Sequence, residues 1–196
     1  MAPVRPWLFN ASKRKDHMKR RRIVAAKTAA GKSVVVSDGP SPREHAFKHI
    51  PGLVLAPLWI VKDVPALPYD GKDPMQEQGT LVQGPGGATF QIVTFPPDSV
   101  MMAPDFNPQL AHEENLKVAT GIADRFEEGN PGMHTTPTVD FGVVLKGRVL
   151  LELDDNATTE LNEGDTYVLH GARHAWRNPT SEPVTLAVVM MGARTG

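Results

Sequence analysis

The chain has 196 residues, of which 40% are hydrophobic and 22% charged, enough for one domain with an apolar core. It contains no cysteine, which excludes disulfides, thiolate metal sites, iron–sulfur clusters and cysteine nucleophiles. The net charge of −1 divides unevenly, because residues 1–22 carry eight basic side chains and one acidic one while the rest of the chain is acidic. We therefore do not expect a nucleic acid as a partner of the body of the protein.

Residues 1–21 form a basic arm with two prolines and little apolar periodicity. A solvated tail is the simplest interpretation, and an arm that folds back on the acidic body or on a neighbouring subunit is the alternative. No apolar run approaches the roughly 18 residues of a membrane span, and the arm lacks the apolar stretch of a secretory signal. We therefore expect a cytoplasmic protein without a membrane partner.

Residues 22–87 predict a hairpin, one further strand and a long loop. Two short β-branched runs, 23–26 and 33–36, flank a small link that contains a glycine, which is typical of a β-hairpin. Residues 52–61 predict a third strand, and residues 63–87 are rich in proline, glycine and polar residues. We expect this section to pack on the remainder of the chain, residues 88–196.

The remainder begins with a predicted strand at 89–95 and one helical stretch at 107–127. Asn107 is a suitable N-cap, Pro108 suits the first helical position, and Gly121 is placed to break the helix in two. The apolar side of this helix is predicted to contain Leu110, Leu116, Val118, Ile122 and Phe126. Short strands separated by turns then follow, which favours an all-β sandwich or small barrel; they are expected at 139–145, 148–153, 158–161, 166–169, 175–177 and 184–190.

Three histidines fall in this strand region, at positions 134, 170 and 174. Because alternate side chains of a strand share a face, His134, Thr136 and Asp140 are expected to point the same way. By the same argument His174 and Trp176 share a face, and Gly171 permits a tight bend before them.

These residues resemble the two motifs of the cupin superfamily of small β-barrels. The first cupin motif is His-x-His, three or four residues, Glu, six residues, Gly, and the second is Gly-Asp, a turn with glycine, His, three residues, Asn. The positions that fit the first spacing are His134, Thr136, Asp140 and Gly147. Those that fit the second are Gly164, Asp165, Gly171, His174 and Asn178. The resemblance covers roughly residues 88–192. The chain as a whole is similar to single-domain cupins with an N-terminal extension.

The resemblance implies a cupin β-barrel whose motif residues line the interior and often hold one divalent metal ion. The ligands would be His134, Asp140 and His174, with iron expected first and manganese, nickel or zinc as alternatives. Two departures leave a metal-free site open: Thr136 stands where the second histidine is usual, and Asp140 stands for the glutamate. Thr136 would orient a bound water or a substrate oxygen. His170 is a candidate replacement ligand, and a turn histidine that faces solvent is the alternative.

The expected activity follows from this site. A two-histidine, one-carboxylate set with open positions is typical of non-heme iron oxygenases, which predicts a metal-assisted oxidoreductase of small-molecule metabolism. The first alternative is a metal-free lyase or isomerase that uses the same residues for acid–base dehydration, cyclisation or decarboxylation. The second alternative is a barrel that binds a small molecule without catalysis.

The pocket and the assembly are predicted in outline. Candidate pocket residues are Trp176, Tyr167, Phe141, Val144 and His170, and Leu186 and Met190 are weaker candidates. Cupins commonly dimerise, and exposed strand edges would be protected in that way, so we expect a homodimer.

Overall fold

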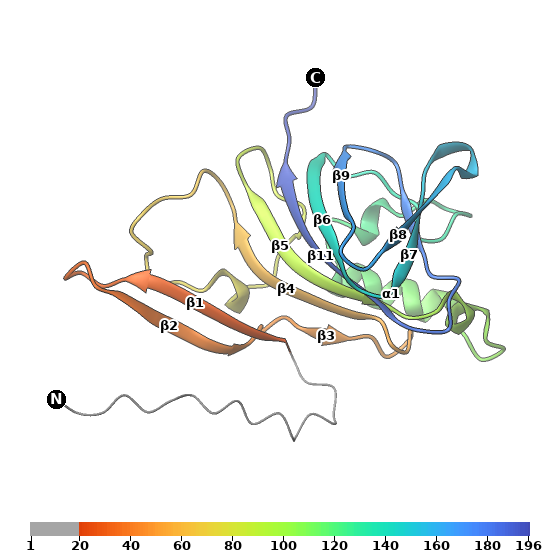
Figure 1. Ribbon diagram of the computed structural model, residues 1–196, viewed down its shortest axis with the longest axis horizontal. Coiled ribbons are helices and arrows are strands. Elements are labelled where there is room, and N and C mark those ends of the chain that lie inside the picture. The colour runs from red at the N-terminus through yellow and green to blue at the C-terminus, as the bar shows by residue number, and fades with distance from the viewer. Residues whose placement is uncertain (1–19) are drawn as a thin grey trace.

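The computed structural model describes residues 20–196 as a β-structure with one α-helix (Figure 1). The predicted basic arm therefore lies outside the described residues except for Arg20 and Arg21. In residues 20–196, no helix has the length and apolar character needed to cross a membrane.

The strands form one large sheet, one small sheet and a separate hairpin. The large antiparallel sheet has six strands in the order β3-β4-β5-β11-β6-β9, and the small one has the order β10-β7-β8. The strands of the large sheet are β3 (His45–Ala46), β4 (Val54–Val61), β5 (Ala88–Phe95), β6 (Thr138–Lys146), β9 (Thr166–His170) and β11 (Val184–Gly192). Those of the small sheet are β7 (Arg148–Glu152), β8 (Thr158–Asn162) and β10 (Ala175–Arg177), and β1 (Arg21–Lys27) pairs with β2 (Ser33–Pro40).

The small sheet closes a barrel over one end of the large sheet. Figure 1 shows β7 and β8 beside β6 and β9, with the hairpin β1–β2 at the opposite end of the molecule. The core between the two sheets is apolar and draws on β6, β7, β9 and β11; its buried members are Val144, Val149, Leu151, Tyr167, Leu169, Val184 and Leu186. This cluster fixes which face of each strand points inward, because side chains alternate between the two faces.

The predicted N-terminal section contributes directly to the large sheet. β4 pairs with β5 along most of its length, and β3 extends the sheet by one short strand that the sequence did not indicate. Arg22 connects the hairpin to this section through an ion pair with Asp73, a hydrogen bond to the Leu58 carbonyl (3.1 Å) and a position 5.7 Å from the Trp59 ring centroid. A buried cation thus helps to hold the hairpin on the body.

The predicted helical stretch is divided as expected, but its buried side differs from the prediction. α1 spans Pro108–Val118, and a short 3₁₀ turn follows at Ala123–Arg125 after Gly121, which has a φ of +90°. Leu110 and Leu116 are exposed, so their assignment to the apolar side was wrong. The buried contacts of this stretch come from the small residues Ala111, Ala119 and Ala123, with Val118, Ile122 and Phe126 partly buried beside them, because the helix lies close against the core.

Gly142 has a packing role that the sequence did not show. It faces inward on β6 between Asp140 and Val144, and its ladder partner on β9 is Tyr167. A Cβ atom at position 142 would lie 2.1 Å from Cζ of Tyr167. The glycine therefore allows the tyrosine ring to lie flat over β6, inside the barrel.

We expect Gly142→Ala to lower the free energy of unfolding by about 1–3 kcal/mol, because the methyl group overlaps the Tyr167 ring. In a Tyr167→Leu background the same substitution is expected to cost much less, because the ring is absent. Chemical denaturation of the four proteins of this double-mutant cycle measures both effects. An equal cost of Gly142→Ala in both backgrounds would contradict the proposed contact.

Candidate functional site

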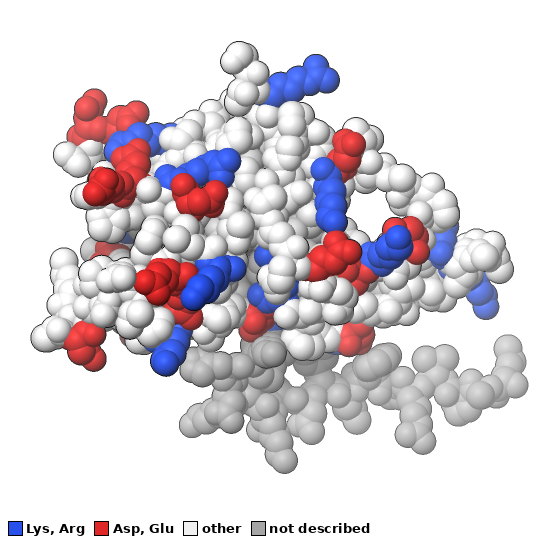
Figure 2. Space-filling model, turned by 180° about the vertical axis from the view of Figure 1, so that it is seen from behind, with Lys and Arg blue, Asp and Glu red and all other residues white. Residues whose placement is uncertain are grey.

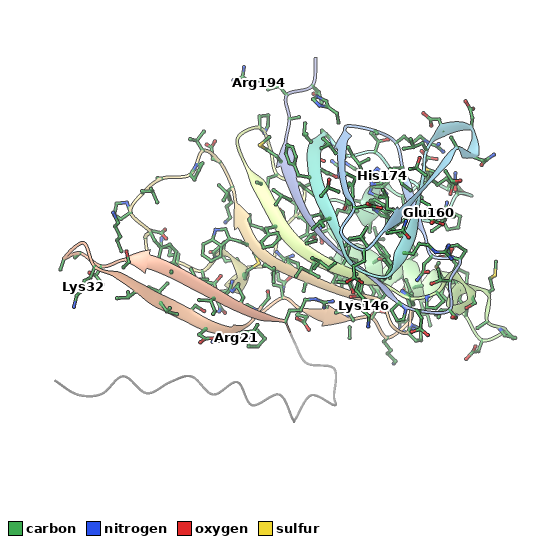
Figure 3. The ribbon with its side chains drawn as sticks, viewed as in Figure 1. Arg21, Lys32, Lys146, Glu160, His174 and Arg194 are labelled. Carbon is green, nitrogen blue, oxygen red and sulfur yellow. The ribbon has the colours of Figure 1, made fainter. Side chains whose placement is uncertain are left out.

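His134 and His174 are joined directly through their backbones. The N–H of each donates to the carbonyl oxygen of the other, and both N–O distances are 3.0 Å. This isolated antiparallel bridge joins the segment before β6 to the segment before β10 and holds the two ring centroids 4.5 Å apart. Figure 3 shows His174 in the barrel end of the ribbon, far from the hairpin marked by Lys32.

Both imidazoles are oriented by the same local contact. Nδ1 of His134 lies 2.9 Å from the Gly132 carbonyl oxygen, and Nδ1 of His174 lies 2.9 Å from the Ala172 carbonyl oxygen. Because a carbonyl oxygen only accepts hydrogen bonds, Nδ1 carries the proton in each neutral ring. Each Nε2 atom therefore keeps a lone pair that can accept a proton or bind a metal ion.

Burial keeps both rings neutral. His134 and His174 are buried, and loss of hydration lowers the pKa of each imidazole. The pKa of His174 falls to about 4, with the neighbouring His134 as a further cause. Two adjacent neutral bases result at pH 7.

Asp140 is a buried carboxyl with an unusually high proton affinity. It points inward on β6, is 5% exposed, and its Oδ1 atom has no hydrogen-bond partner among residues 20–196. Burial raises the pKa of Asp140 to about 6, and the Thr138 hydroxyl offsets part of this rise by favouring the ionised form. Asp140 is therefore a proton carrier near neutral pH.

The predicted metal ligands do not come together as a set of three. The part of the chain that the structure describes contains no group of three or more His, Asp or Glu side chains that could hold a metal ion. His134 and His174 present Nε2 in the manner of metal-binding histidines, whose other ring nitrogen donates to a carbonyl. Asp140 does not join them, so this arrangement does not fit a three-ligand site, and a bound metal stays a prediction.

The neighbouring threonines are already hydrogen-bonded to each other. Thr136, predicted to orient a water or substrate oxygen, is 3% exposed, and its hydroxyl lies 2.7 Å from that of Thr138. Thr136 is thus buried together with His134 and Asp140, which agrees with the predicted alternation.

Two predicted pocket residues extend the site as an aromatic wall. The Trp176 ring centroid lies 5.9 Å from that of His174 and 4.8 Å from that of Tyr167. On the other side, Phe126 makes an edge contact with His134 at 5.4 Å, which the sequence did not indicate. Val144 is fully buried in the apolar core and contributes packing below this wall.

Two other predicted pocket residues lie on the outer face of the large sheet. Phe141 is 45% exposed and His170 is exposed, because their strand neighbours Asp140 and Leu169 point inward. Phe141 instead lines an apolar hollow of about 230 Å³ on that outer face, and a second hollow of about 380 Å³ lies between the hairpin and Trp59. Apart from Phe141, neither hollow contains a predicted site residue.

Ion pairs at the barrel rim hold the two histidine segments together. Arg173, next to His174, donates to Glu127 (2.6 Å) and Asp154 (2.9 Å), and Arg177 pairs with Glu152 and donates to the Pro131 carbonyl (2.6 Å). Arg173 holds the pKa of the Glu127 carboxyl below its usual range. Over the face turned away in Figure 1, basic and acidic side chains lie next to each other in the same way (Figure 2).

Sequence reasoning missed Gln91, a further buried polar residue of the barrel interior. Gln91 is 4% exposed on β5, while its neighbour Phe90 is 40% exposed on the outer face. The run from Thr89 to Ile92 alternates polar and apolar residues, a pattern that normally places the apolar side chains in the core. Here the structure reverses that pattern, so the sequence alone gave no signal that Gln91 is buried.

Comparison with known proteins places a recognised domain over this site. Residues 126–190 match the cupin domain family (Cupin_2), a range that includes both histidines and Asp140. In the solved structure of a Cupin 2 conserved barrel domain protein from Salinispora arenicola, 18% of residues are identical, with a TM-score of 0.36, over 72% of this chain and 76% of that one.

Curated relatives match part of the chain. The Oryzines biosynthesis cluster protein J of Aspergillus oryzae is 33% identical over 79 residues, which are 38% of this chain and 44% of that protein. The cupin-domain-containing oxidoreductase srdB of Neurospora crassa is 30% identical over 104 residues, 50% of this chain and 53% of that protein. The chain thus spans about half the length of these relatives.

We expect Asp140→Asn to gain stability relative to the wild type as the pH rises. The folded-state pKa of Asp140 is about 6 and its unfolded value about 4, so the folded wild type loses stability through the ionisation of a buried carboxyl between pH 4 and 6. The amide does not ionise. The stability difference between variant and wild type should therefore shift by about 2–3 kcal/mol in favour of the variant between pH 4 and 7.5.

Denaturant unfolding of both proteins with a chelator present measures this shift. The contributions of His134 and His174, which have the opposite sign in the same pH range, are common to both proteins and cancel. A stability difference that is independent of pH would show that Asp140 titrates normally.

Proposed function

Because residues 126–190 form a cupin domain, we propose that the protein is a small-molecule enzyme that transfers protons with a histidine pair inside its barrel. The observation that supports this proposal is the His134–His174 bridge, which sets two buried imidazoles side by side with their Nδ1 atoms donating to carbonyl oxygens. Both Nε2 atoms are then free to act as general bases.

The chemistry available to this pair is proton removal followed by proton return. Nε2 of one histidine takes a proton from a substrate C–H or O–H bond, and the electron pair of that bond stays on the substrate. The imidazolium then returns the proton to another substrate atom, which gives an isomerisation, or to a leaving hydroxyl, which departs as water. His174 is the stronger candidate for proton return, because its depressed pKa makes its imidazolium a strong acid.

Asp140 and the aromatic wall support this role. The carboxyl holds or releases a proton near pH 6, close to the working range of a general acid or base. Trp176 packs against His174, with Tyr167 behind it, and limits the access of water to that ring. The relative from an oryzines biosynthesis cluster suggests that the substrate is an intermediate of small-molecule biosynthesis.

A metal-assisted oxidoreductase is the second candidate. The shared orientation of Nε2 on both histidines and the similarity to a cupin-domain-containing oxidoreductase favour it. His134 and His174 would hold the ion, and the ion would supply redox or Lewis-acid chemistry. Among the described residues, Asp140 does not complete a three-ligand site with the two histidines. The predicted homodimer and cytoplasmic location also stay predictions.

We expect chelator-treated enzyme in D₂O at pH 7 to catalyse hydrogen–deuterium exchange next to the carbonyl of small ketones and β-hydroxy ketones, measured by NMR. His134→Gln and His174→Gln should each lower the exchange rate by about 100-fold or more, because each removes a base of the pair. His112→Gln, a change at an exposed position on α1, is the matched control and should leave the rate unchanged.

Three results would contradict the proposed proton transfer. Turnover that requires added Fe(II) and dioxygen would support the oxidoreductase. Retention of exchange in both histidine variants would show that neither histidine of the pair catalyses it. Tight binding of these compounds without exchange would indicate a barrel that only binds.

A further inference from the structure

Four buried side-chain atoms within residues 20–196 have no hydrogen-bond partner, and two of them lie inside the barrel. These two are Oε1 of Gln91 and Oδ1 of Asp140, both oxygen atoms, and the other two belong to Arg22 and Arg43 of the N-terminal section. Because a buried acceptor without a partner destabilises a fold, such atoms are rare unless a ligand or water satisfies them.

The two oxygen atoms belong to side chains on β5 and β6, the two strands that flank Met190 of β11. Nε2 of Gln91 donates to Sδ of Met190 at 3.3 Å, and Met190 on β11 is the ladder partner of Asp140 on β6. Ladder partners point to the same face of a sheet, so Met190 and Asp140 share the inner face. Gln91 is opposite Val188, two residues before Met190, and therefore lies diagonally across β11 from Asp140; Gln91, Met190 and Asp140 are all buried. The amide nitrogen is occupied by the sulfur, which leaves the amide oxygen for another partner.

The surroundings of the two oxygen atoms leave both without a hydrogen-bond donor. The nearest ladder positions are apolar, with Val188 opposite Gln91 and Leu169 opposite Asp140. Thr89 donates to the Leu81 carbonyl at 2.7 Å. The hydroxyls of Thr138 and Tyr167 lie near the Asp140 carboxyl, but neither is a hydrogen-bond partner of Oδ1. Two unpartnered acceptors thus stand inside the barrel.

We infer that Gln91 and Asp140 bind a substrate group with two hydrogen-bond donors, such as a primary amide or a primary amine, on a compact and mostly apolar molecule. One donor hydrogen goes to Oε1 of Gln91 and the other to Oδ1 of Asp140. This inference rests on the proposed function in placing the substrate inside the barrel. Carboxylates and phosphates are disfavoured there, because two acceptor oxygens, one of them on an ionisable carboxyl, repel an anion.

Gln91 is then a binding residue whose presence opposes stability. Gln91→Met keeps an unbranched side chain of similar length and removes the unpaired oxygen. A structural role for Gln91 predicts a lower melting temperature for this variant, and a binding role predicts an equal or higher one.

The test compares benzamide with acetophenone, in which a methyl group replaces the NH₂ group, and with benzoate. Ligand-detected NMR titration with the full chain measures the three affinities in chelator-containing buffer at pH 7. We expect benzamide to bind about tenfold more tightly than acetophenone, and benzoate to bind most weakly. Gln91→Met should abolish the preference for benzamide without lowering the melting temperature. Gln109→Met, the same substitution at an exposed position on α1, is the matched control and should retain the preference.

Equal affinities for benzamide and acetophenone in the wild type would overturn the inference, and so would an unchanged preference in Gln91→Met. Tighter binding of benzoate would overturn it as well, because it would show a donor where the structure has an acceptor. These readouts need no turnover. A preference for benzamide without proton exchange would therefore reject the proposed function while keeping this binding site.

Discussion

The paired backbone hydrogen bonds between His134 and His174 are the contact on which the rest of the site depends. They connect segments 40 positions apart and bring both rings to a centroid distance of 4.5 Å. The repeated contact from Nδ1 to a carbonyl two residues earlier then selects the same tautomer in both rings. The partly buried rim ion pairs of Arg173 and Arg177 reinforce this bridge.

The barrel contains buried polar groups that lower the stability of the fold and make proton transfer possible. Its walls are apolar, yet it encloses two imidazoles, the carboxyl of Asp140 and the amide of Gln91. Low hydration lowers the pKa of the histidines and raises that of Asp140, which moves all three toward the neutral form. Groups in this state exchange protons at modest cost, and unpaired oxygens remain for a ligand to satisfy.

The strand rhythm and the cupin motifs predicted the fold, because turns and alternation are local properties of the sequence. They also predicted that Trp176 accompanies His174. They did not predict which face of each strand is buried, since that depends on pairing with distant strands. Phe141, a candidate pocket residue, therefore lies on the outer face, and His170 is exposed, in agreement with its solvent-facing alternative. Gln91 was missed because its strand reverses the usual polar alternation. The buried face of α1 consists of small alanines, which carry little apolar signal.

The histidine pair can be observed directly by ¹⁵N NMR of protein labelled at histidine, in the presence of a chelator and over pH 5–8. The account predicts that His134 and His174 both stay neutral at pH 7 and both carry the proton on Nδ1. Resonances are assigned with the His134→Gln and His174→Gln variants. A proton on Nε2, or a positively charged ring at pH 7, in either histidine would contradict the account.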